Sequence, residues 1–114
     1  MRIESFASRG VRVLAFLGKL ELGSGDEELI RAFDGEVAAG ARFLVLDLHD
    51  LKWIDSAGIG AVVRCAKHAA EKGAVLKIVL DAGGPVRKMF AATQLDRAFE
   101  VFDDAASAVG SFPA

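Results

Sequence analysis

The chain has 114 residues, of which 53% are hydrophobic and 26% are charged, and its formal net charge at pH 7 is −2. This length and composition indicate one globular domain over residues 1–114 and exclude disorder for most of the chain. The net charge is small and the sequence has no runs of like charge. It therefore gives no sign of a basic surface that would bind nucleic acid or an anionic membrane.

The cysteine content and the N-terminus bear on the cellular compartment. The single cysteine, Cys65, excludes an internal disulfide and a cysteine-based zinc site. The first residues carry an acid and lack the apolar core of a signal peptide. No apolar stretch approaches the about 20 residues that span a bilayer. We therefore expect a cytoplasmic protein without direct membrane insertion.

The first third of the chain predicts a hairpin and a helix. Residues 2–8 and 11–17 read as two antiparallel strands around the turn Arg9-Gly10. The second run is apolar at nearly every position, which indicates a strand covered on both faces. A capping box at residues 24–27 predicts the start of a helix, and Gly40 is the expected stop.

The middle of the chain predicts a strand, a polar bend, a helix and another strand. Residues 43–46 form a continuous apolar run, typical of a central strand. After the bend, apolar residues recur at helical spacing over 59–70, and Gly73 ends that helix. Residues 74–80 are the next predicted strand.

The last third completes an α/β pattern. Pro85 suits the first position of a helix over Pro85–Ala92, residues 99–102 read as a strand, and Asp103-Asp104 caps a helix over 105–109. We expect a single domain with a mainly parallel five-stranded sheet, an antiparallel first strand and about four helices.

Loops that follow strands of such a sheet gather at one edge. The loops concerned cover residues 18–25, 50–58 and 81–85, with Ser56 in their middle. In Asp55-Ser56-Ala57-Gly58, unpaired N–H groups at the helix start favour negative charge, so Ser56 is a natural seat for a phosphate. A plain alternative is that Asp55 or Ser56 only caps the helix.

Gly58 and Gly60 also stand out in the first helical turns. Glycine there indicates close approach of another group, either a docking partner or a neighbouring loop. Trp53, just before this stretch, fits either a packed lid or a binding anchor.

The sequence contains no motif that supports an enzymatic function. Ser56 follows a strand as a hydrolase nucleophile does, but Ile54 stands where that motif requires glycine. The only histidines, His49 on the bend and His68 well along the helix, do not complete a catalytic triad. The histidines and carboxylates lack metal-ligand spacing. We expect no catalysis, no metal and no cofactor.

Several motifs occur together in order. They are Asp47-Leu48 with Leu51, the run Ile54-Asp55-Ser56-Ala57-Gly58-Ile59-Gly60, the turn Gly18-Lys19-Leu20-Glu21, and residues 85–90 with Leu95. Together they resemble the STAS-domain family of anti-sigma-factor antagonists over almost the whole chain. The resemblance implies a β-α superhelix in which Ser56 is phosphorylated by an anti-sigma factor that is also a serine kinase.

The resemblance also implies a switching cycle. The unphosphorylated chain binds the kinase and frees a sigma factor, and a metal-dependent serine phosphatase resets the phosphorylated chain. We expect a monomer that contacts its partner through the helix start and the neighbouring loops. The expected contact residues are Glu21, Trp53, Asp55, Ser56, Ala57, Gly58, Ile59 and Gly60.

Two residues depart from the family pattern. Ala57 stands where many antagonists have a second Ser or Thr, and Glu21 stands where Asp is usual. A small residue after the serine is also found in STAS subunits of bacterial lipid-transport ABC systems. A scaffold role in such a transporter complex is therefore the alternative function.

Overall fold

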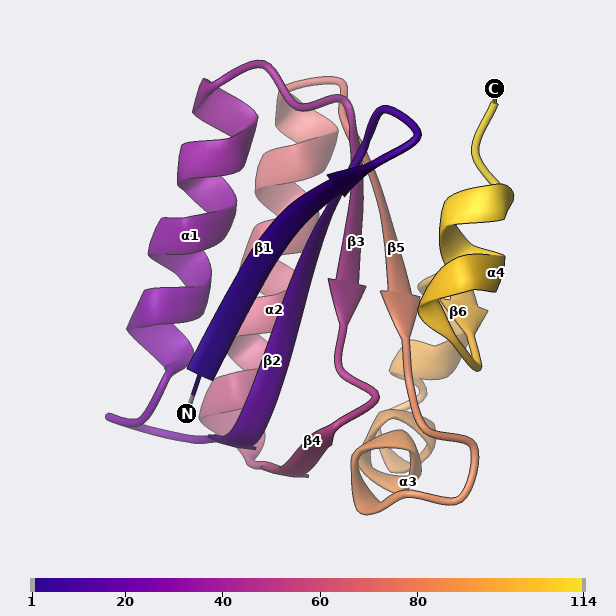
Figure 1. Ribbon diagram of the computed structural model, residues 1–114. Coiled ribbons are helices and arrows are strands. Elements are labelled where there is room, and N and C mark those ends of the chain that lie inside the picture. Colours follow the sequence, from indigo (N-terminus) through magenta and orange to yellow (C-terminus); the bar gives the residue numbers. More distant parts are fainter. Residues whose placement is uncertain (1, 114) are drawn as a thin grey trace.

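A mixed six-stranded sheet runs through the computed structural model, which describes residues 2–113 (Figure 1). The strands are β1 (Arg2–Ser8), β2 (Val11–Leu20), β3 (Phe43–Asp47), β4 (Leu51–Ile54), β5 (Val75–Val79) and β6 (Val101–Phe102). Their order is β1-β2-β3-β5-β6, and β4 pairs with β2 outside this path. β1 is antiparallel to β2, and all other pairs are parallel. The predicted mainly parallel sheet with an antiparallel first strand is confirmed, but it has six strands and not five, and β6 is shorter than the predicted 99–102.

Helices cover both faces of the sheet. α1 (Asp26–Ala38) and α2 (Ser56–Glu71) lie side by side on one face, and α4 (Ala105–Gly110) lies on the other (Figure 1). α3 (Pro85–Ala92) packs near β4 and the 3-10 turn η1 (Leu95–Arg97). The four helices confirm the predicted α/β fold. Within residues 2–113, none of them combines the length and the apolar character needed to cross a bilayer.

Alternation along the strands divides the core into two clusters. Leu14 and Phe16 of β2 belong to the larger cluster, together with Phe33 of α1. Val13 of the same strand belongs to the smaller cluster, together with Val109 of α4. Successive side chains of a strand point to opposite faces, so β2 is buried on both sides. Its nearly uninterrupted apolar run follows from this position, as predicted.

Residues 51–54 form a strand, and their interpretation as a polar bend was wrong. β4 pairs in parallel with the end of β2, which continues to Leu20 past its expected end, with a register shift next to Gly18. Only Leu51 and Ile54 of β4 are buried. The two central residues are both exposed, so the segment lacks the alternation by which a strand is recognised.

The helix starts differ from one another in their capping. The capping box predicted at residues 24–27 is wrong, because Gly25 is the N-cap of α1 and no side chain caps that helix. Ser24 instead pairs through its backbone with Glu21. At α4, the carboxylate of Asp104 accepts a hydrogen bond from the Ser107 N–H at 2.7 Å. That acidic cap was predicted and is confirmed.

Cys65 of α2 is 1% exposed and belongs to the larger core cluster. Burial raises the pKa of its thiol to about 12, so almost no reactive thiolate exists at neutral pH. We predict that an alkylating reagent modifies the native protein at least about 100-fold more slowly than the protein unfolded in denaturant. Intact-mass measurement over time checks this, and rapid labelling of the native protein would contradict the buried position.

Candidate functional site

Asp55 closes the first turn of α2. Its backbone is extended, with φ −106° and ψ −173°, and its Oδ1 accepts a hydrogen bond from the Gly58 N–H at 2.9 Å. This bond satisfies one of the N–H groups that lack partners within a helix. Of the two caps that the sequence left open, Asp55 is therefore the one that forms.

Ser56 is the first residue of α2, and it is exposed. Because Asp55 provides the cap, the hydroxyl of Ser56 is not required for it. The start of a 16-residue helix favours a negatively charged group through its free N–H groups and its dipole. The position therefore combines access for a modifying enzyme with a local field that tolerates a phosphate.

The carboxylate of Asp55 also reaches a second segment of the chain. Its Oδ2 accepts a hydrogen bond from the Leu22 N–H at 3.1 Å. The Asp55 N–H in turn donates to the Leu20 carbonyl oxygen at 3.2 Å. The bond from Gly58, followed by the bond from Leu22, holds the pKa of the Asp55 carboxyl below its ordinary value. Asp55 thus ties the end of β2 to the start of α2.

Leu22 lies in a tight turn directly after β2. The backbones of Glu21 and Ser24 exchange two hydrogen bonds, of 3.0 and 2.9 Å. Gly23 has a φ of 74°, a conformation that glycine adopts without steric cost. The side chain of Leu22 is 78% exposed. The sequence interpretation missed this residue, although an apolar side chain followed by glycine in a turn was a visible signal.

Gly58 and Gly60 have different surroundings. A Cβ on Gly58 would lie 2.5 Å from the Leu20 carbonyl oxygen and 2.7 Å from Cγ1 of Ile54. The close approach indicated by the sequence is, at Gly58, packing within the chain. Gly60 is exposed, and nothing lies within 4 Å of a Cβ placed there.

The eight predicted contact residues differ in how accessible they are. The exposed residues are Trp53, Ser56 and Gly60, the half-buried ones are Glu21, Asp55 and Ala57, and the buried ones are Gly58 and Ile59. Trp53 is 42% exposed, which is more open than a packed lid requires. A partner can reach the exposed residues. Gly58 and Ile59 are buried, so they support the position of the helix start and are not available for direct contact.

The three loops predicted to gather at one edge meet around His49. Its Nδ1 lies 3.0 Å from Oδ1 of Asp50, and its Nε2 lies 4.0 Å from Oδ1 of Asp81. Ser56 does not line the hollow formed there, but it adjoins Asp55, which joins two of the three loops through its bond from Leu22. The other histidine, His68, pairs with a carboxylate of α1. Among residues 2–113, no group of three or more His, Cys, Asp or Glu side chains is placed to hold a metal ion.

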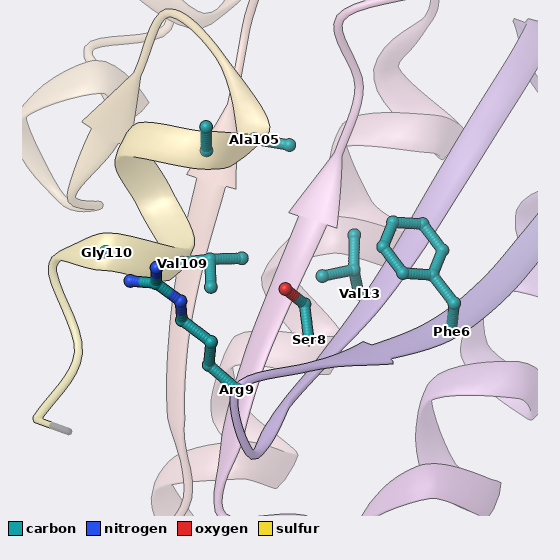
Figure 2. A pocket seen from close by; sticks show the side chains of 8 residues that line it. Phe6, Ser8, Arg9, Val13, Ala105, Val109 and Gly110 are labelled. Carbon is teal, nitrogen blue, oxygen red and sulfur yellow. The ribbon is translucent and has the colours of Figure 1, made fainter.

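A separate hollow of about 430 Å³ lies between the β1–β2 hairpin and α4 (Figure 2). Phe6, Val13 and Val109 contribute apolar walls, and the side chain of Arg9 extends beside α4 (Figure 2). This hollow is near the start of β2, whereas Ser56 follows the strand that pairs with the end of β2. It is therefore not part of the Ser56 site.

A family model described as the STAS domain matches residues 4–108, which include the whole Ser56 region. The chain belongs to the STAS domain family. The predicted resemblance is confirmed by this match and by the fold. No curated protein sequence matches this STAS domain.

Solved structures share the fold of this STAS domain. An anti-sigma factor antagonist from Mycobacterium paratuberculosis is 19% identical, with 96% of this chain and 92% of that chain covered and a TM-score of 0.85. The phosphorylated form of the Bacillus cell fate determinant SpoIIAA is 17% identical, with coverage of 96% and 97% and a TM-score of 0.70. A sulfate transporter family protein from Wolinella succinogenes is 17% identical, with coverage of 92% and 86% and a TM-score of 0.77. Identities this low support the shared fold alone.

Proposed function

We propose that this STAS domain is an anti-sigma factor antagonist that works by partner switching in the cytoplasm. Unphosphorylated, it binds an anti-sigma factor that is also a serine kinase and thereby releases a sigma factor. Phosphorylation of Ser56 ends the binding, and a metal-dependent serine phosphatase restores it. The observation that carries the proposal is the exposed Ser56 at the start of α2, next to an aspartate that already provides the helix cap.

A phosphate on Ser56 is compatible with the fold. It adds about −1.5 to −2 charge and three acceptor oxygens. The N–H groups of the first helical turn and the helix dipole favour that charge. The cap bond between Asp55 and Gly58 does not involve the serine hydroxyl. The chain therefore keeps its fold when it is modified, and the main effect falls on the partner.

The partner loses affinity because its surface has to cover a charged group. In the unphosphorylated state the neighbourhood of Ser56 offers a small hydroxyl and the exposed side chains of Leu22 and Trp53. A partner that buries this neutral surface excludes water from it. A phosphate dianion in the same place must lose hydration without gaining a cation, which costs affinity. In this cycle the STAS domain is the substrate of the kinase and catalyses nothing itself.

The phosphorylation step has a direct test. Incubation with an anti-sigma factor serine kinase from the same organism, together with ATP and Mg²⁺, is expected to add one phosphate, which mass spectrometry maps to Ser56. Ser56→Ala is expected to abolish the modification, and Ser107→Ala, at the other acid-capped helix start, is expected to leave it intact. A phosphate on another residue, or none, would rule out the proposal.

Ala57 favours one alternative function, a constitutive scaffold in a bacterial ABC transporter complex for lipids. It leaves the helix start with a single hydroxyl, that of Ser56. Affinity purification from the native cell separates the two functions. Permease and ATPase subunits that remain bound to Ser56→Asp support the scaffold. An anti-sigma factor that binds the unmodified chain and is lost from Ser56→Asp supports the antagonist.

A further inference from the structure

We infer that Asp55 is a positioning residue whose carboxylate couples the modification state of Ser56 to the Leu22 turn, residues 21–24. The turn and the helix start are far apart in the sequence, and the two oxygens of one carboxylate join them. Oδ1 accepts from Gly58 in α2 at 2.9 Å, and Oδ2 accepts from Leu22 at 3.1 Å. The inference rests on the proposed function for the phosphate on Ser56, and its first test does not require the partner.

The Leu22 turn is closed by the two backbone hydrogen bonds between Glu21 and Ser24, and the bond from Leu22 to Asp55 ties it to the start of α2. Gly23 and Gly25 both have positive φ, 74° and 90°, and glycine leaves the backbone more alternatives than any other residue. The side chain of Leu22 is 78% exposed, so packing contributes little to its position. The hydrogen bond from the Leu22 N–H to Asp55 therefore helps to hold this apolar side chain on the surface beside the start of α2.

A phosphate on Ser56 acts directly on that contact. It places up to two negative charges on the residue adjacent to the Asp55 carboxylate, and like charges at such short range repel. The carboxylate shifts, and the bond to Leu22 is the longer of its two bonds. Phosphorylation thus loosens the turn as well as adding charge.

The loosened turn weakens partner binding through entropy. A Leu22 side chain held in place can dock without further ordering, whereas a mobile turn must be ordered when the partner binds. The partner that fits this surface is the anti-sigma factor. Its binding surface would carry an apolar pocket for Leu22 next to a site for the Ser56 hydroxyl. Phosphorylation therefore removes an anchor and adds a charge in a single step.

The first test uses the free protein. Exchange of backbone amide protons with water is measured by NMR on the unmodified chain and on a chain that carries phosphoserine at position 56, installed during translation. The Leu22 amide is expected to exchange about 10-fold faster in the modified chain, because one hydrogen bond is lost. Amides in the middle of α2 are expected to keep their rates. An unchanged rate at Leu22 would overturn the inference, whether or not any kinase binds the protein.

The second test uses substitutions and the partner. Asp55→Ser keeps one side-chain acceptor for the helix cap but has no second oxygen for Leu22. It is expected to speed Leu22 exchange and to weaken binding of the anti-sigma factor about 10-fold. Leu22→Ala is expected to weaken binding by a similar factor, and the double variant is expected to bind no worse than Leu22→Ala alone. Losses that multiply in the double variant would show that the two residues act independently and would overturn the coupling.

The matched control is Asp104→Ser, which makes the same change at the acidic cap of α4, where the carboxylate accepts from Ser107 at 2.7 Å. It is expected to leave both Leu22 exchange and binding unchanged. Asp55→Asn, which keeps the shape of the side chain and one acceptor oxygen, replaces Asp55→Ser if the serine variant fails to fold. If the unmodified chain binds no anti-sigma factor, the proposed function fails, and the exchange rates still decide the coupling within the chain.

Discussion

Ser56→Asp is expected to lower the affinity for the anti-sigma factor kinase by about 100-fold or more, because it places a permanent charge where the partner buries a neutral hydroxyl. Ser56→Ala is expected to bind at least as tightly as the unmodified chain and to remain bound in the presence of ATP. Neither change removes the cap bond between Asp55 and Gly58, so both variants are expected to fold. Isothermal titration calorimetry with the purified proteins measures the affinity of each variant for the kinase.

Ser107→Asp is the matched control for this experiment. It adds the same charge at the start of α4, where Asp104 supplies the cap as Asp55 does at α2. Its affinity is expected to equal that of the unmodified chain, which would show that the loss in Ser56→Asp depends on position and not on net charge. The switch is wrong if Ser56→Asp and Ser107→Asp bind equally well.

Gly58→Ala is expected to lower the free energy of unfolding by about 3 kcal/mol. The added Cβ would meet the Leu20 carbonyl oxygen at 2.5 Å and Cγ1 of Ile54 at 2.7 Å. The carbonyl belongs to the backbone of β2 and cannot rotate away as a flexible side chain could. Relief requires α2 to move away from the β2–β4 pair, which also moves Asp55 and Ser56. Urea unfolding followed by circular dichroism measures the change.

Gly60→Ala is the matched control, since it makes the same chemical change two residues further along the same helix. Nothing lies within 4 Å of a Cβ there, and the residue is exposed. Because alanine favours a helix more than glycine does, Gly60→Ala is expected to raise the free energy of unfolding by about 0.5–1 kcal/mol. Equal effects of the two substitutions would contradict the packing explanation for Gly58. A Gly60→Ala variant that is more stable but binds the anti-sigma factor less well would identify Gly60 as a contact residue.

Much of the fold could be predicted because it depends on local patterns. Helical spacing of apolar residues marks α2, Pro85 marks the start of α3, and Gly40, with φ 100°, follows the end of α1. The apolar runs of β2 and β3 predict central strands, and the alternation of strands and helices predicts a parallel sheet. The signals for single helices and strands lie within short stretches of sequence, and their alternation is read along the chain, so none of them requires knowledge of the tertiary contacts.

The features that were missed depend on partners distant in the chain. β4 is a strand because the end of β2 offers it an open edge, and its own residues carry no alternation. Ser24 fails as a cap because its backbone is engaged by Glu21 in the turn. Such competition between local and long-range hydrogen bonds is decided by geometry, which a local pattern does not contain.

The same division applies to the Ser56 site. Its residue types and their order were enough to place a hydroxyl at a helix start and to indicate the STAS family. Only the tertiary structure showed that Asp55 and not Ser56 caps the helix, that Gly58 is packed against β2, and that the Leu22 turn is held by Asp55. The contacts of Gly58 with β2 and of Leu22 with Asp55 join segments more than 30 residues apart, and their free energy depends on distances that arise only when the sheet and α2 have come together.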